Sequence, residues 1–209
     1  WDHSSRYGGF FTPRLHVKYS PNSIVTLRTS VGKGYRSPHA LAENVSLLAS
    51  GREIFVSPDL KQEEAWNTGA SLGFNIPLFG RNLELNAEYY YTDFVNQMIM
   101  NFDGASGQHT LRFENLDGKS YSHTFQVDAT YALFSGMTAT AAFRLNDVKC
   151  TYDGSLRQKP LTSRYKGLLT LSYNTPLELW QFDVTGQLNG GGELYDQSSY
   201  PAYFQLQAQ

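Results

Sequence analysis

Residues 63–94, EEAWNTGASLGFNIPLFGRNLELNAEYYYTDF, contain one pattern twice, with a turn between the two copies. In the first copy, apolar or small side chains occupy every second position: Trp66, Thr68, Ala70, Leu72, Phe74 and Ile76. After a break at residues 77–81, the second copy repeats the pattern with Leu83, Leu85, Ala87, Tyr89 and Tyr91. A period of two is typical of a β-strand with one apolar and one polar face. The stretch therefore predicts an antiparallel hairpin.

The length of these strands indicates a sheet that spans a membrane. Strands of soluble proteins usually have about five or six residues, whereas the alternation continues from Trp66 to Ile76. At ~3.3 Å per residue and a tilt of about 45°, this run rises roughly 23 Å. An outer-membrane barrel carries an apolar band of about that height. Aromatic residues also stand where the interfacial girdles of such a barrel require them: Trp66 and Tyr91 at one end, Phe79 at the other.

The second face of the hairpin is polar and fits a water-filled lumen. A soluble sandwich would have to bury Glu84, Asn86 and Glu88 with partners. The residues that we expect to face lipid are Leu72, Phe74, Leu85, Val127 and Phe182. The residues that we expect to face the lumen are Arg14, Lys18, Arg28, Glu84 and Glu88, with Lys33 following them at the exit of its strand.

The composition agrees with a barrel and excludes other classes of protein. The 209 residues carry a formal charge of -2 and a pI of about 6.2, so no basic footprint for nucleic acid is visible. Charged residues make up only 17%, mean hydropathy is -0.41, and no apolar run is long enough for a spanning helix. Cys150 is the only cysteine, which excludes a disulfide framework and a cysteine-based zinc site, and we expect it in a loop.

Strand patterns recur along the whole chain and are joined by alternately short and long connections. Short ones are expected near residue 21 and at 77–81, 134–136 and 174–176; long ones are expected at 32–62, 101–119, 146–163 and 189–201. Short periplasmic turns and long extracellular loops are typical of transmembrane barrels. We expect about nine strands, a short helix within residues 40–48 and brief pairing at 111–113. A soluble antiparallel sheet is the alternative, but it must explain the long strands and the polar inner face.

Five segments resemble, in order and spacing, the later barrel strands of TonB-dependent outer-membrane receptors. They are FFTPRLHVKYSP (10–21), VGKGYRSPHALAE (31–43), LKQEEAWNTGASLGF (60–74), AEYYYTDFVNQMI (87–99) and FENLDGKSYSHTFQVDATY (113–131). They are most similar to siderophore and cobalamin receptors of Bacteroides-like bacteria. The resemblance implies a barrel of about 22 strands around a plug. It also implies energy coupling through TonB and capture of a scarce nutrient, such as a ferric siderophore, cobalamin or haem.

Two parts of such a receptor are missing from the chain: the plug with its TonB box, and a final strand that ends in an aromatic residue. We therefore expect residues 1–209 to form one partial barrel domain, an internal piece of a longer receptor. Its partners would be outer-membrane lipid, the plug of the same receptor, TonB acting through that plug, and a small metal-chelate or vitamin ligand. The piece should be an open, curved antiparallel sheet, since strands of a wide barrel cannot close on themselves.

The candidate ligand-binding residues lie in the first long loop: Tyr35, Arg36, His39 and Arg52. Guanidinium groups and aromatic rings in an extracellular vestibule would suit an anionic chelate. The alternative is that this loop is merely solvated. The cations expected in the lumen are better explained by pairing with plug carboxylates, because a plugged barrel must satisfy its inner polar groups.

No catalytic or metal-binding set emerges from the sequence, and no cofactor is expected. The histidines are scattered without metal-ligand spacing: His3, His16, His39, His109 and His123. Met98 and Met100 share a strand face and could contact a soft metal ion, but apolar packing is the simpler explanation. We therefore do not expect an enzyme, although a barrel lipase is a class to test. The main alternative function is a passive outer-membrane channel or an adhesin-like barrel.

Overall fold

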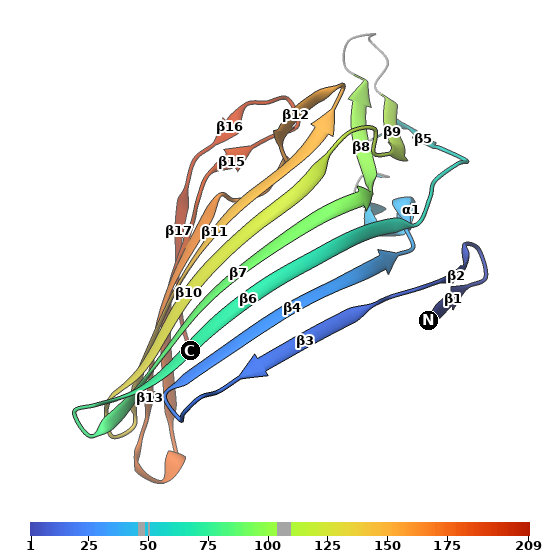
Figure 1. Cartoon of the computed structure of the whole chain (residues 1–209). Coiled ribbons are helices and arrows are strands. Elements are labelled where there is room, and N and C mark those ends of the chain that lie inside the picture. Colours follow the sequence, from blue (N-terminus) through green and yellow to red (C-terminus); the bar gives the residue numbers. More distant parts are fainter. Residues whose placement is uncertain (46–48, 50, 104–109) are drawn as a thin grey trace.

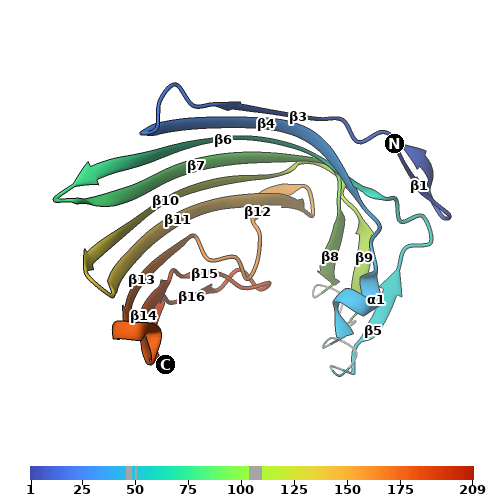
Figure 2. The same cartoon turned by 90° about the horizontal axis from the view of Figure 1, so that it is seen from below.

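The main element of the chain is a long antiparallel sheet, curved like part of a barrel wall and open at both edges (Figures 1 and 2). The computed structural model describes residues 1–45, 49, 51–103 and 110–209. Within these residues the sheet has ten strands, of which nine follow the path β17-β14-β13-β11-β10-β7-β6-β4-β3, while β12 pairs with β11. The prediction of about nine antiparallel strands in an unclosed barrel segment is confirmed.

The bounds of the elements show how much longer the central strands are than the others. The sheet contains β3 Arg14–Tyr19, β4 Val25–Arg36, β6 Glu63–Leu78, β7 Arg81–Asn96, β10 Ser120–Phe134, β11 Met137–Tyr152, β12 Ser155–Gln158, β13 Tyr165–Asn174, β14 Gln181–Asn189 and β17 Tyr203–Ala208. The smaller elements are β1 Asp2–Ser4, β2 Gly8–Phe10, α1 Ala40–Glu43, β5 Glu53–Val56, β8 Met98–Asp103, β9 Thr110–Asn115, the 3-10 helix η1 Pro176–Glu178, β15 Gly192–Glu193 and β16 Ser199–Tyr200.

The central hairpin, β6 and β7, is tighter than the sequence suggested. Pro77 and Leu78 still pair, with Asn82 and Arg81, so the turn contains only Phe79 and Gly80. Both have positive φ angles, 49° and 75°, as a two-residue type I′ turn requires. A glycine at the second position adopts this backbone without strain. The break predicted over residues 77–81 therefore shrinks to two residues.

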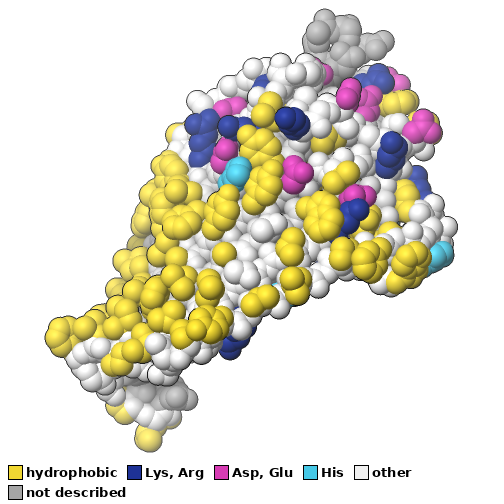
Figure 3. Space-filling view, viewed as in Figure 1, with side chains coloured by type: hydrophobic (Ala, Val, Ile, Leu, Met, Phe, Trp, Pro, Cys, Tyr) yellow, Lys and Arg dark blue, Asp and Glu magenta, His cyan; other side chains and the backbone are white. Residues whose placement is uncertain are grey.

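The pairing register places apolar and polar side chains on opposite faces of the sheet. One row of direct cross-strand partners runs through Val25, Phe74, Leu85, Ala129, Ala141, Leu169, Gly186 and Leu206. A row on the other face runs through Lys18, Arg28, Ser71, Glu88, Gln126, Arg144, Lys166 and Asn189. Hydrophobic side chains cover the convex face toward the short turns, while charged ones gather toward the long loops (Figure 3). The predicted lipid-facing and lumen-facing sets thus lie on opposite faces.

Two strands run further into the loop end of the sheet than predicted. β4 extends to Arg36 and β11 to Tyr152, whereas we expected loops from residues 32 and 146. β11 then turns back into β12 through Asp153 and Gly154, whose φ angles of 49° and 74° again mark a two-residue turn. Cys150 is consequently not in a loop: it lies in β11 and is buried. An Asp-Gly pair is typical of such two-residue hairpin turns.

The helix α1 and the strands β5, β8, β9, β15 and β16 gather at the loop end, over the concave side of the sheet, whereas η1 lies in the short turn between β13 and β14 (Figures 1 and 2). The expected helix is only α1, Ala40–Glu43, and residues 46–48 of that prediction lie outside the described part of the chain. β7 does not continue through Met100 as expected but ends at Asn96, and β8 starts a separate sheet with β9 and β5. Across the described residues, none of the helices has the length and apolar character needed to cross a membrane.

Candidate functional site at the loop end of the sheet

A small packed unit stands at the loop end of the sheet. Its three strands follow the order β5-β9-β8, with β5 parallel to β9 and β8 antiparallel to it. Buried Ala40, Leu60 and Phe113 form its core, and further apolar side chains pack against them: Ile54, Val56, Met98 and Met100. Leu111 of β9 is fully buried as well. This unit, α1 with β5, β8 and β9, is called the loop unit below.

Gln97 anchors the loop unit to the sheet where β7 passes into β8. Its side chain is buried, and its Oε1 accepts a hydrogen bond of 2.7 Å from the Ser120 hydroxyl at the start of β10. Its backbone carbonyl accepts another of 2.7 Å from the Leu116 amide. The two ends of the second long connection are therefore fastened to one residue.

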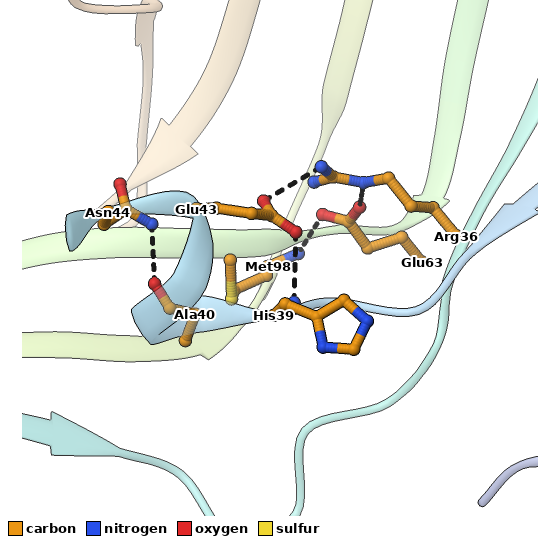
Figure 4. Close-up of polar contacts among 7 residues, drawn as sticks. All are labelled: Arg36, His39, Ala40, Glu43, Asn44, Glu63 and Met98. Atoms are coloured by element: carbon orange, nitrogen blue, oxygen red, sulfur yellow. Dashed lines mark hydrogen bonds and ion pairs between the residues drawn. The ribbon is translucent and has the colours of Figure 1, made fainter.

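Arg36 joins the first and second long connections through two carboxylates (Figure 4). Its Nε donates to buried Glu63 of β6, and its Nη1 donates to Glu43 of α1 at 2.9 Å. Glu63 Oε1 also accepts from the Met98 amide at 3.0 Å, and Glu43 Oε1 accepts from the His39 amide at 3.0 Å. The hydrogen bond to Glu63 raises the pKa of Arg36 above its ordinary value, against a smaller opposing effect of burial. The two carboxylates thus neutralise Arg36, which links β6 to α1. Arg36, Glu43 and Glu63 are called the clamp below.

The structure separates the four residues predicted to form a ligand site. Tyr35 is next to Arg36 on β4 and therefore points to the opposite face of the sheet. There its ring lies 4.7 Å from that of Phe10 and 5.2 Å from the Lys33 ammonium. His39 enters the clamp only through its backbone, and its exposed ring points away from Arg36 (Figure 4). Arg52 is exposed just before β5.

Lys33 also differs from the prediction, which placed it with the lumen-facing cations. It shares the parity of Val25 and Val31, so it lies on the apolar, convex face. Its ammonium is 5.8 Å from the Trp66 ring and 2.6 Å from Glu64 Oε1. Such a mixed aromatic and charged group is typical of the boundary between lipid and water.

The predicted lumen-facing residues all lie on the polar face. Arg14, Lys18 and Arg28 come from β3 and β4, and Glu84 and Glu88 come from β7. None of the five forms an ion pair with another described residue. Neighbouring polar side chains bond to each other instead: Asn86 Nδ2 donates to Asp128 at 2.9 Å, and Arg144 donates twice to Gln126 Oε1, at 2.8 and 2.6 Å.

A pocket of about 160 Å³ opens between the loop unit and the ends of the later strands. Its lining comes from β4, α1, β8, β9, the end of β11, the segment after β12 and the turn between β15 and β16, and includes Arg36, Glu43, Asn44, Gln97, Met98, Met100, Phe113, Tyr152, Lys159 and Tyr195. A smaller pocket shares Met100, Tyr152, Pro160 and Tyr195 with it. Together they form the loop-end pocket. Of the predicted ligand residues, only Arg36 lines it.

Three polar side chains near the loop-end pocket have raised pKa values. Burial raises the pKa of Tyr152 far above its ordinary value, and it raises the pKa values of Tyr195 and Cys150 in the same direction. The two phenols therefore stay protonated and can donate hydrogen bonds into the pocket. Sequence reasoning missed both tyrosines, because they become neighbours only when the β11–β12 hairpin and the β15–β16 turn are folded.

The described residues contain no group of three or more histidines, cysteines or carboxylates that could hold a metal ion. Met98 and Met100 pack against the core of the loop unit, as the simpler explanation of their spacing required. His16 and His123 lie on opposite faces: His16 pairs with Ser30 on the polar face, whereas His123 contacts Tyr89 and Tyr91 on the apolar face. His109 lies outside the described residues.

The long strands, the apolar convex face and the polar concave face together define a segment of an outer-membrane β-barrel. The chain matches the family described as TonB dependent receptor-like, beta-barrel over residues 1–209, and it belongs to that family. The resemblance seen in the sequence is therefore confirmed at the level of the family, and the chain is an outer-membrane protein. Its similarity to receptors of Bacteroides-like bacteria in particular stays a prediction.

The chain is similar to an outer-membrane protein in sequence and to receptors and a transporter in fold. Over 99 residues it is 26% identical to the iron-regulated outer membrane virulence protein of Vibrio cholerae serotype O1, covering 46% of the chain and 15% of that protein. Its fold matches the ferric enterobactin receptor of Pseudomonas aeruginosa with a TM-score of 0.66 at 15% identity, covering 98% of the chain and 33% of the receptor. The siderophore receptor PirA of Acinetobacter baumannii gives 0.64 at 14%, covering 97% and 34%. The copper transporter OprC gives 0.69 at 13%, covering 93% and 30%.

Proposed function

We propose that the chain supplies part of the barrel wall and extracellular loops of a receptor that takes up an iron chelate of the siderophore class. The family membership and the iron-related names of several relatives support this reading. The chain spans about 15% of the curated relative and about a third of the receptor structures, so the activity belongs to a larger protein.

The observation that carries the proposal is the pairing of a loop-end pocket with a polar concave face whose charges are unpaired. Arg14, Lys18, Arg28, Glu84 and Glu88 have no ion-pair partner among the described residues. Charges of both signs on a lumen wall can be satisfied by a plug of complementary charge. A plug blocks free diffusion, so transport has to begin with capture at the loops and proceed by plug rearrangement. In this proposal TonB drives that rearrangement through the plug.

An uptake experiment separates this receptor from a passive channel or adhesin. Iron-starved cells that express the full-length protein are given a radiolabelled ferric siderophore, with and without TonB and with and without an uncoupler of the proton gradient. A receptor gives saturable uptake that disappears without TonB or the gradient. Uptake that rises linearly with concentration and ignores both would establish a passive channel, and no uptake at all would favour an adhesin.

A further inference from the structure

We propose that Arg157 and Lys159, at the end of the β11–β12 hairpin, form a donor-rich wall of the loop-end pocket that binds an anionic, oxygen-rich aromatic arm of the chelate. A catecholate group has this chemistry, whereas a hydroxamate group of a neutral chelate does not. The inference rests on the proposed function, since it names the class of chelate that the proposed receptor would take.

An unsatisfied donor in this wall indicates a missing acceptor. Arg157 Nε is buried without a hydrogen-bond partner among the described residues, and Arg157 lines the smaller part of the pocket, on the face of β12 that it shares with its partner Cys150. Buried donors nearly always have a partner in folded proteins, because an unmet one costs about 1–3 kcal/mol. A ligand oxygen that accepts a hydrogen bond from Arg157 would remove that cost.

Lys159 supplies a positive charge that has no ion-pair partner among the described residues. The other cations around the pocket are neutralised: Arg36 by Glu63 and Glu43, Arg157 by Asp153 at 3.5 Å, and Arg164 by Glu193 at 2.6 Å. Lys159 lines the pocket and makes no ion pair with any residue in the described ranges. Its backbone is fixed, since its amide donates to the Val148 carbonyl at 2.8 Å. The pocket therefore favours an anion at a defined place.

The rest of the pocket suits an aromatic ring. Phe113, Met98 and Met100 give it an apolar side from the loop unit, and Tyr152 and Tyr195 add two rings from the opposite side. The hydroxyls of both tyrosines remain protonated because burial raises their pKa values, so they can donate to phenolate oxygens. Aromatic side chains pack against rings in offset or edge-on geometry, and thioethers contact ring edges.

The size of the pocket limits what enters it. Its larger part has a volume of about 160 Å³ and its smaller part about 50 Å³, each below the roughly 300–1,000 Å³ of sites that enclose drug-sized ligands. It therefore accommodates one arm of a chelate, while the remainder stays outside. A single-arm contact is compatible with a receptor in which other loops and the plug hold the rest.

Binding of two chelates of different charge tests the assignment on purified full-length receptor in detergent. The probes are a ferric tricatecholate complex, which is anionic, and a ferric trihydroxamate complex, which is neutral. Wild-type receptor should prefer the tricatecholate. Lys159→Ala should weaken that affinity about tenfold, the scale of one charge-assisted hydrogen bond, whereas Lys159→Arg should stay close to wild type.

Lys149→Ala is the matched control. Lys149 lies on the same hairpin, but it pairs with Tyr121 on the convex face, so its loss should leave binding unchanged. Folding of each variant is checked by its heat-dependent mobility on gels. If Lys159→Ala does not fold, the salt dependence of wild-type binding decides, since affinity for the anionic probe should fall with ionic strength more steeply than affinity for the neutral one.

Four outcomes would overturn the assignment. Equal affinity of a folded Lys159→Ala receptor and wild type for the tricatecholate removes this wall from the site and leaves the proposed function standing. So does a wild-type preference for the neutral trihydroxamate, or the same salt dependence for both probes. Wild-type receptor that binds neither ferric complex would overturn the proposed function itself, and this assignment with it.

Discussion

The barrel wall and the loop unit are stabilised in opposite ways. The buried apolar side chains of the loop unit include Ile99, Leu111 and Phe113, with exposed fractions of 7%, 0% and 1%. In the wall, the apolar side chains of Val127, Leu169 and Phe182 are 38%, 51% and 53% exposed. The wall is a single layer whose apolar face needs lipid, while the loop unit encloses a core of its own. A substitution should therefore act through solvation in the wall and through packing in the loop unit.

Phe113→Ala should have the largest effect and should act only on the loop unit. Removing a fully enclosed ring costs about 3–5 kcal/mol because it leaves a cavity. Amide hydrogen exchange of the full-length receptor in detergent should speed up in β5, β8 and β9 and stay slow in β6 and β7. Phe55→Ala is the control, since Phe55 is 41% exposed. Exchange that accelerates equally in the wall would contradict the independence of the two regions.

Leu85→Arg should be the next most damaging change, this time in the wall. Leu85 is the fifth residue of β7 and lies on the apolar face, where Arg near the bilayer midplane costs about 2–4 kcal/mol. Asn86→Arg places the same side chain on the polar face beside Asp128 and should be mild. Folding titrations of the full-length receptor into bilayers measure both. Equal costs would show that the two faces are not distinguished by solvent.

The same contrast explains how much the sequence could reveal. The wall was predictable because alternation is a local pattern. The parity of Leu72, Leu85 and Val127 is enough to assign them to one face, and that face contacts lipid while the other contacts water. The two-residue turn at Asp153 and Gly154 also had a local signal, so its omission was avoidable. The extension of β4 to Arg36 had no such signal, because the side chains at the end of this strand follow a pattern that a loop could have equally well.

The loop-end pocket could not be read from the sequence for a physical reason. Arg36, Tyr152 and Tyr195 are far apart along the chain and meet only through the loop unit and the ends of the later strands. The parallel pairing of β5 with β9 joins two different connections, and loop closure of this kind has no periodic signature. The predicted ligand-binding residues Tyr35, Arg36, His39 and Arg52 are not brought together, in part because Tyr35 and Arg36 are neighbours on a strand and face opposite sides.

Glu63→Gln tests the clamp between the two regions and should have a moderate effect. The amide keeps an acceptor for the Met98 amide but loses the charge that holds Arg36, which should destabilise the loop unit by about 1–3 kcal/mol. Limited proteolysis of the full-length receptor should cut residues 37–62 faster. Glu64→Gln is the matched control, because its partner Lys33 lies on the convex face, away from the clamp. Equal cleavage of both variants would mean that the clamp does not hold the loop unit.

Tyr89→Phe should have the smallest effect and should act where the wall meets the loop end. The Tyr89 hydroxyl lies 2.8 Å from His123 Nδ1 on the apolar face, so its removal should cost about 0.5–1.5 kcal/mol in bilayer folding titrations. Tyr91→Phe is the matched control: the Tyr91 hydroxyl is 3.4 Å from Asp93, too long for a strong hydrogen bond, and its loss should cost less. Both variants keep their rings, so any difference isolates the hydrogen bond from interfacial anchoring. If the two costs are the same, the aromatic rings alone position this part of the wall. The stability of the wall would then depend on solvation as far as its boundary with the packed loop unit.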